Sequence, residues 1–147
     1  MKQIIYLFLF TIIGLSAKTQ NADAILGKWI NEKQTRTIEI YKNNDLYYGR
    51  VLSLKDSEKG VGSKRLDIKN PNSSLNNRKI IGIDFLMSFS YFTDRDVWKE
   101  GHIYNYETGN TYSGKLSINK DGSMDLTGYY GILWFLGRTQ TLTRVTE

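Results

Sequence analysis

The fold of this chain is decided by its C-terminal stretch, Gly128-Tyr-Tyr-Gly-Ile-Leu-Trp-Phe-Leu-Gly-Arg-Thr-Gln-Thr-Leu-Thr-Arg-Val145. The stretch reads as a strand, a short apolar irregularity and a final strand. From residue 138 onward the side chains alternate between two faces, as they do along a β-strand. One of these faces carries Arg138, Gln140, Leu142 and Arg144.

A second motif, Gly27-Lys-Trp29, opens the first strand expected near the other end of the chain. A barrel pairs its first and last strands, because this pairing removes both open sheet edges. If these two strands run antiparallel, Trp29 lies close to Arg144. A guanidinium over an indole face is favourable by roughly 0.5–2 kcal/mol. We therefore expect Gly27, Trp29 and Arg144 to form a structural barrel floor.

The residues between these two ends indicate short strands joined by tight turns. Residues 21–26 are expected to form one helical turn, with Asn21 as its N-cap, that covers the floor. Strands are then predicted over 29–30, 35–41, 46–54, 80–92, 97–98, 102–106, 111–119 and 123–132, before the final strand from residue 138. The count is about eight or nine, with no long helix outside the N-terminal segment. The predicted fold is therefore all-β, a single antiparallel up-and-down barrel.

Residues 1–17 have the pattern of a secretory signal peptide. Lys2 precedes a run of about twelve mostly apolar residues, and the small residues Ser16 and Ala17 follow it. The run is shorter than the ~20 residues of a transmembrane helix, so we expect no membrane anchor. Cleavage at a position from 17 to 22 would leave a single barrel domain, residues 18–147, in the periplasm or outside the cell.

The composition excludes several kinds of chemistry. The chain has no cysteine, so thiol catalysis, thiolate metal sites and a lipoprotein anchor are excluded, and stability must come without disulfides. The one histidine, His102, is a poor basis for a catalytic triad or a zinc site. Asp94, Asp96 and Glu100 are interpreted as solvated acids of a turn. We therefore expect no enzyme activity, no cofactor and no metal.

The net charge of +5 is interpreted as a solvated surface, because basic residues are interleaved with acidic ones along the chain. Without a basic cluster, and with export expected, a nucleic-acid partner is not predicted.

The polar segment Lys55–Lys79 is unusually long for a connection within a compact domain. It is rich in Asp, Ser, Gly, Asn and Lys and contains the only proline, Pro71. Loops of this length often cover or form binding sites, which makes a lid one interpretation. The alternative is a disordered or purely decorative insertion.

Several motifs carry a resemblance to known families. The Gly-x-Trp opening and the C-terminal arginine resemble the lipocalin-like (calycin) barrels. A set of motifs spread over nearly the whole chain after the signal resembles an exported bacterial family, domain of unknown function 2147. These motifs are Ala24-Ile-Leu-Gly-Lys-Trp29, Ile38-Glu-Ile-Tyr41, Tyr47-Tyr-Gly49, Asn70-Pro71, Leu75-Asn-Asn-Arg78, Gly101-His-Ile-Tyr104, Gly109-Asn-Thr-Tyr112, Gly128-Tyr129 and Leu136-Gly-Arg-Thr-Gln-Thr141. The resemblance implies export and a calycin-like barrel, and it implies no activity.

The barrel interior offers a ligand-binding hypothesis. Arg138 is predicted to point inward at the end opposite the floor, where it needs either an internal partner or an anionic ligand group. We expect a small amphipathic or apolar ligand, with Arg138 and Gln140 as polar anchors. The expected wall consists of Trp98, Tyr104, Tyr106, Tyr130 and Trp134. The alternative is a filled barrel without a ligand, a monomer that serves as a structural or protein-interaction module of the cell envelope.

Overall fold

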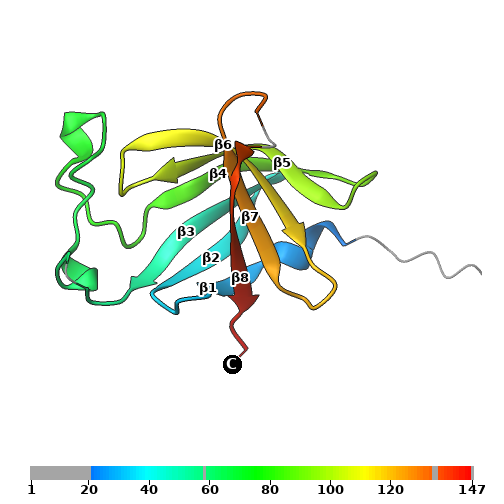
Figure 1. Cartoon of the computed structure of the whole chain (residues 1–147), viewed down its shortest axis with the longest axis horizontal. Helices are drawn as coiled ribbons and strands as arrows, with labels where there is room; N and C mark the ends of the chain where they lie inside the picture. Colours follow the sequence, from blue (N-terminus) through cyan, green and yellow to red (C-terminus); the bar gives the residue numbers. More distant parts are fainter. Residues whose placement is uncertain (1–20, 58, 134–135, 147) are drawn as a thin grey trace, which may run out of the picture.

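The computed structural model describes residues 21–57, 59–133 and 136–146, and these form a closed antiparallel barrel. Each strand pairs with the next along the chain, and the last pairs with the first (Figure 1). The strands are β1 (Gly27–Asn31), β2 (Arg36–Asn43), β3 (Leu46–Leu54), β4 (Asp84–Phe92), β5 (Val97–Asn105), β6 (Asn110–Ile118), β7 (Met124–Tyr129) and β8 (Arg138–Arg144). The all-β prediction is confirmed with eight strands. The two segments predicted separately over 97–98 and 102–106 merge into the single strand β5, and Tyr106 lies just beyond it.

The floor of the barrel is covered by a short 3-10 helix, η1 (Ala22–Ile25), at the start of the described chain (Figure 1). The Asn21 side chain accepts a hydrogen bond from the Asp23 amide at 3.0 Å, which is the predicted N-cap. The backbone of η1 accepts two indole N–H groups, from Trp29 to the Ile25 carbonyl at 2.8 Å and from Trp98 to the Ala22 carbonyl at 3.0 Å. The turn is therefore fixed to the barrel by both tryptophans.

The closure of the barrel brings its first and last strands together. Trp29 is the register partner of Arg144. The guanidinium of Arg144 lies 4.2 Å from the centroid of the Trp29 ring. It also donates to the carbonyl oxygen of Leu26 at 2.7 Å and to that of Ala24. All of these acceptors belong to the main chain, which the fold itself holds in place.

The middle of the barrel is filled by Phe89, whose side chain is fully buried. A Cβ atom at Gly101 or Gly114 would lie 2.4 Å or 2.5 Å from atoms of the Phe89 ring. These two positions therefore require glycine so that the ring can lie against the backbone of β5 and β6.

Two bulges change which side chains face inward on β4 and β5. Ser88 and Glu100 have positive φ values of 59° and 65°, and the strand register shifts at both places. A bulge inserts one residue, so the alternation beyond it is reversed. Trp98 and Tyr104 would share a face on a regular strand, but the bulge at Glu100 separates them. β4 also begins only at Asp84, so the predicted strand over 80–92 was too long at its start.

The connection between β3 and β4 is a folded segment beside the barrel (Figure 1). It contains η2 (Gly62–Lys64), η3 (Ser73–Leu75) and a bridge between Leu66 and Lys79. Its central anchor is Asp67, which is completely buried. The carboxylate of Asp67 accepts hydrogen bonds from the Tyr104 hydroxyl at 2.6 Å, from Asn70 at 2.8 Å and from Arg78 at 2.8 Å. This arrangement is at odds with a disordered insertion, and a lid role stays a prediction.

The predicted signal peptide lies outside the described residues. Within the ranges that the structure describes, no helix has the length and apolar character needed to cross a membrane.

Candidate functional site

The end of the barrel opposite η1 opens into a cavity of about 610 Å³. Ligand pockets of proteins typically measure roughly 300–1,000 Å³, so this volume suits one small molecule. The wall of this mouth cavity is built mainly from apolar and aromatic side chains. They include Phe85, Ile103, Tyr104, Tyr106, Tyr112 and Leu126.

Arg36, at the start of β2, is the polar group at the centre of the mouth. Its guanidinium lies 5.0 Å from the centroid of the Phe85 ring. It donates one hydrogen bond to the Tyr106 hydroxyl at 3.3 Å and another to the side-chain oxygen of Gln140. Its Nε atom is buried and has no hydrogen-bond partner among the described residues. The guanidinium therefore meets only uncharged acceptors and retains an unused donor.

Sequence reasoning missed Arg36, although a signal for it was present. Arg36, Ile38 and Ile40 have the same parity along β2, and both isoleucines are buried in the core. Period-two alternation therefore places Arg36 on the inward face. A charged side chain is rarely buried, so an arginine is not normally expected on the inward face of a strand.

Gln140 and Arg138, the two predicted anchors on β8, both line the mouth cavity. Gln140 accepts from Arg36, as described above, whereas the Arg138 side chain is exposed at the rim. Among the described residues, no carboxylate forms an ion pair with Arg36 or Arg138. The mouth thus contains two guanidinium groups that lack an acidic partner there.

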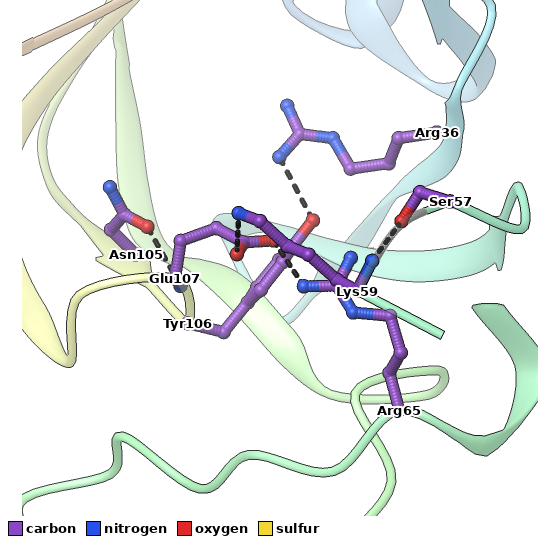
Figure 2. A network of polar contacts seen from close by, with 7 residues as sticks. All are labelled: Arg36, Ser57, Lys59, Arg65, Asn105, Tyr106 and Glu107. Atoms are coloured by element: carbon purple, nitrogen blue, oxygen red, sulfur yellow. Dashed lines mark hydrogen bonds and ion pairs between the residues drawn. The ribbon is translucent and has the colours of Figure 1, made fainter. Parts of the chain in front are cut away.

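Among the described residues, Glu107 is the one acidic residue in the lining of the mouth cavity, and it already has partners. Lys59 lies 2.8 Å from its carboxylate, and Arg65 contacts the other oxygen (Figure 2). Burial alone would raise the pKa of Glu107, but the hydrogen bonds from these two cations outweigh it and hold the pKa below its usual value. Glu107 therefore stays charged and is not available to neutralise Arg36.

Three of the five predicted wall residues line the mouth cavity: Tyr104, Tyr106 and Tyr130. Tyr104 is buried, and burial together with its hydrogen bond to Asp67 raises its pKa to about 12. Tyr130 is exposed, and its ring centroid is 4.6 Å from that of Tyr112. Tyr104 comes from β5, Tyr106 from the turn after it and Tyr130 from the position just after β7.

The placement of Trp98 in the ligand wall was wrong. Trp98 is fully buried at the floor, where its ring centroid lies 4.9 Å from that of Tyr91 and 6.3 Å from that of Tyr47. The physical reason is its position along β5. Trp98 is the second residue of this strand, which starts at the floor, and its indole N–H donates to the Ala22 carbonyl of η1. Trp134, the other tryptophan of the predicted wall, lies outside the described residues.

The remaining candidates for chemistry are dispersed. His102 is exposed on β5, and Asp96 accepts a hydrogen bond from Tyr91 at 2.8 Å in the turn after β4. In the part of the chain that the structure describes, no three His, Asp or Glu side chains gather as metal ligands.

Comparison with known proteins places the chain in a family. Residues 27–144 match the model of a family described as uncharacterized protein conserved in bacteria, DUF2147. The chain belongs to this family. The match runs from the glycine that opens β1 to the arginine that closes β8, so it covers the whole barrel.

A solved structure supports the same architecture. Protein HP1028 from the human pathogen Helicobacter pylori, described as belonging to the lipocalin family, superposes with a TM-score of 0.71. The two chains share 26% sequence identity, and the alignment covers 84% of each. No curated protein is significantly similar to this family member. The barrel is thus lipocalin-like.

Proposed function

We propose that this protein is an exported, monomeric barrel that binds one small amphipathic molecule in its mouth cavity. The observation that carries the proposal is a cavity of about 610 Å³ with an apolar wall, in which Arg36 has no acidic partner among the described residues. The apolar part of the ligand lies against Phe85, Ile103 and Leu126. Its polar end accepts hydrogen bonds from Arg36 and Arg138, with Gln140 beside them.

Partial burial of the Arg36 guanidinium without an acidic partner lowers the stability of the ligand-free barrel. A partly buried charge is unfavourable unless it is paired, and a charge-assisted hydrogen bond to an anion is about twice as strong as one between neutral groups. An anionic ligand group would give Arg36 the partner that the chain does not supply. The proposal assigns no reaction to the cavity, because a ligand carrier needs only shape and charge complementarity.

A protein-interaction role is the second candidate, and it has one specific observation in its favour. The connection between β7 and β8 exposes apolar side chains, with Ile132 exposed to 88% and Leu136 to 70%. Exposed apolar groups in one loop are typical of contact surfaces. The cavity nevertheless favours ligand binding over the filled barrel that an interaction module would allow.

The test is a binding titration with the medium-chain fatty acid decanoate and a variant that fills the cavity. Gly128 lines the mouth, and a Cβ atom there would be 3.5 Å from Ile103, which is ordinary contact. Gly128→Leu should therefore fold and occupy ligand space. Calorimetry should show one decanoate per wild-type chain, and we expect the variant to bind about tenfold more weakly or worse.

The matched control is Thr143→Leu, which adds the same side chain to an exposed position on the outward face of β8. It should bind as the wild type does. Native mass spectrometry of the protein purified from its own cell envelope fraction would identify any bound molecule. A wild type that binds neither decanoate nor any co-purified amphiphile would overturn the proposal and favour the interaction module.

A further inference from the structure

A second, smaller cavity of about 290 Å³ adjoins the mouth cavity. It lies between the start of β2, the first residues after β3 and the turn after β5. Arg36, Tyr106, Glu107 and Gln140 line both cavities. The hydrogen bonds from Arg36 to Tyr106 and Gln140 therefore lie at the boundary between the two spaces.

The side cavity differs from the mouth cavity in its charges. Four cationic side chains contribute to its lining, namely Arg36, Lys55, Lys59 and Arg65, against the two carboxylates of Asp56 and Glu107. Figure 2 shows Lys59 and Arg65 converging on Glu107 from the long loop, with Arg36 reaching Tyr106 beside them. Among the described residues of this lining, which do not include Glu58, the balance of formal charge is positive.

The two carboxylates already have partners inside the protein. Glu107 holds Lys59 and Arg65, and Asp56 accepts a hydrogen bond from the Gly62 amide at 2.8 Å. Lys55 is exposed, whereas Arg36 is half-buried, and neither side chain forms an ion pair with a described residue. Two cationic side chains that form no ion pair with a described residue thus line a small polar space.

A group with several acceptor oxygens and more than one negative charge would use these donors best. A carboxylate can satisfy the guanidinium fork of Arg36, but it cannot also reach several further cations. A phosphate carries about −1.5 to −2 charges near pH 7 and three strong acceptor oxygens. Arginine binds phosphate through parallel hydrogen bonds, and lysine binds it as a point charge.

We propose that the side cavity is a head-group subsite for a phosphate-bearing amphiphile, whose apolar tail occupies the mouth cavity. Arg36 holds the phosphate at the boundary, after the head group replaces Gln140 as its acceptor. Lys55 and Lys59 also line the subsite and contribute further positive charge, Lys59 while it is paired with Glu107. This inference rests on the proposed function, because it assigns the tail of the ligand to the mouth cavity.

The test compares three ligands that share one tail: decanol, decanoate and decyl phosphate, each titrated below its micelle concentration. We expect decyl phosphate to bind at least about tenfold more tightly than decanol to the wild-type protein, with decanoate between them. The double variant Lys55→Gln/Lys59→Gln should lose most of the preference for decyl phosphate. Its Kd for decanol should stay within about twofold of the wild type, since the apolar wall of Phe85, Ile103 and Leu126 is unchanged and decanol carries no charge.

The control double variant, Lys64→Gln/Lys69→Gln, removes the same charge from exposed positions of the same loop that do not line the side cavity. It should retain the preference for decyl phosphate. Equal losses in both double variants would show a general charge effect and overturn the inference.

The remaining outcomes separate the two proposals. Binding of decanol and decanoate without a preference for decyl phosphate would overturn the subsite and leave the proposed function intact. Failure of all three ligands to bind would remove the proposed function itself. Inorganic phosphate supplies the last comparison. If it bound as tightly as decyl phosphate, the site would serve a free anion and not the head group of an amphiphile.

Discussion

The floor and the mouth of the barrel both place an arginine against an aromatic ring, but the hydrogen-bond acceptors of the two guanidinium groups differ. At the floor, Arg144 lies over Trp29 and donates to main-chain carbonyls of Leu26 and Ala24. At the mouth, Arg36 lies over Phe85 and donates to side-chain acceptors, with Nε unpartnered among the described residues.

A structural arginine and a ligand-binding arginine differ in the acceptors that they contact. Main-chain carbonyls cannot turn away without breaking the fold, so the contacts of Arg144 are permanent. The Gln140 amide and the Tyr106 hydroxyl can rotate, so a stronger acceptor can replace them. An arginine over an aromatic ring therefore closes one end of the barrel through fixed contacts. At the other end, a ligand can replace the contacts of such an arginine.

The largest effect should come from removing the centre of the floor. Trp29 is fully buried and anchors η1 through its indole N–H. We expect Trp29→Ala to lower the free energy of unfolding by about 3–5 kcal/mol, because it leaves a large cavity in a packed core. Urea denaturation measures this change. A loss below about 1 kcal/mol would show that the floor does not stabilise the fold in the way its packing indicates.

A pair of arginine variants tests the comparison directly. Arg144→Met should cost about 2 kcal/mol, because it removes two charge-assisted hydrogen bonds to η1 and the contact with Trp29. Arg36→Met should change the stability by less than about 1 kcal/mol in either direction, since methionine removes a partly unsatisfied charge from an apolar wall. Urea titrations of the two variants measure both changes. Equal losses in the free energy of unfolding would show that the two arginines contribute to stability in the same way.

The smallest effect concerns the anchor of the long loop beside the mouth. Tyr104→Phe should lower the stability by about 1 kcal/mol near pH 8, because the buried carboxylate of Asp67 loses one of its donors. The folded-state pKa of Tyr104 is raised to about 12, whereas an unfolded tyrosine titrates near 10. The stabilising contribution of the protonated hydroxyl is therefore complete below about pH 10 and lost as the pH rises through about 12.

The difference in the free energy of unfolding between the wild type and Tyr104→Phe should consequently become smaller between about pH 10 and pH 12. Thermal unfolding at several pH values measures it. Tyr91, whose pKa is also raised to about 12 by burial and its hydrogen bond to Asp96, is present in both proteins and cancels in the difference. A gap that stays constant across this range would show that the hydroxyl does not titrate as its environment indicates.

Local patterns were sufficient to predict the barrel. Alternation along β2 and β8, and the turn residues between strands, predicted the antiparallel order. The Gly27 and Trp29 motif predicted the pairing of the first strand with the last. These features depend on residues close together in the sequence, or on the general requirement that a barrel has no edge.

The site was predicted only in part, because it depends on bulges and long-range contacts. Arg138 and Gln140 follow from strand parity and line the cavity, whereas Tyr106 lines it from the turn after β5. Trp98 was misplaced because the direction of β5, from the floor towards the mouth, follows from the barrel topology and not from a local pattern. The role of Asp67 was also hidden, since its partner Tyr104 is 37 residues away and its burial arises from the folded loop.

The contact between Arg144 and the turn over the floor has a consequence for synthesis. It joins positions 118 and 120 residues apart, so it forms only when nearly all of the chain is available. A nascent chain that has left the ribosome as far as β7 still has two unpaired edges, on β1 and on β7, which other chains could pair with. The seven residues of β8 cover both edges in one step. A chain that terminates shortly before Arg138 would therefore carry almost the whole core and still be prone to aggregate.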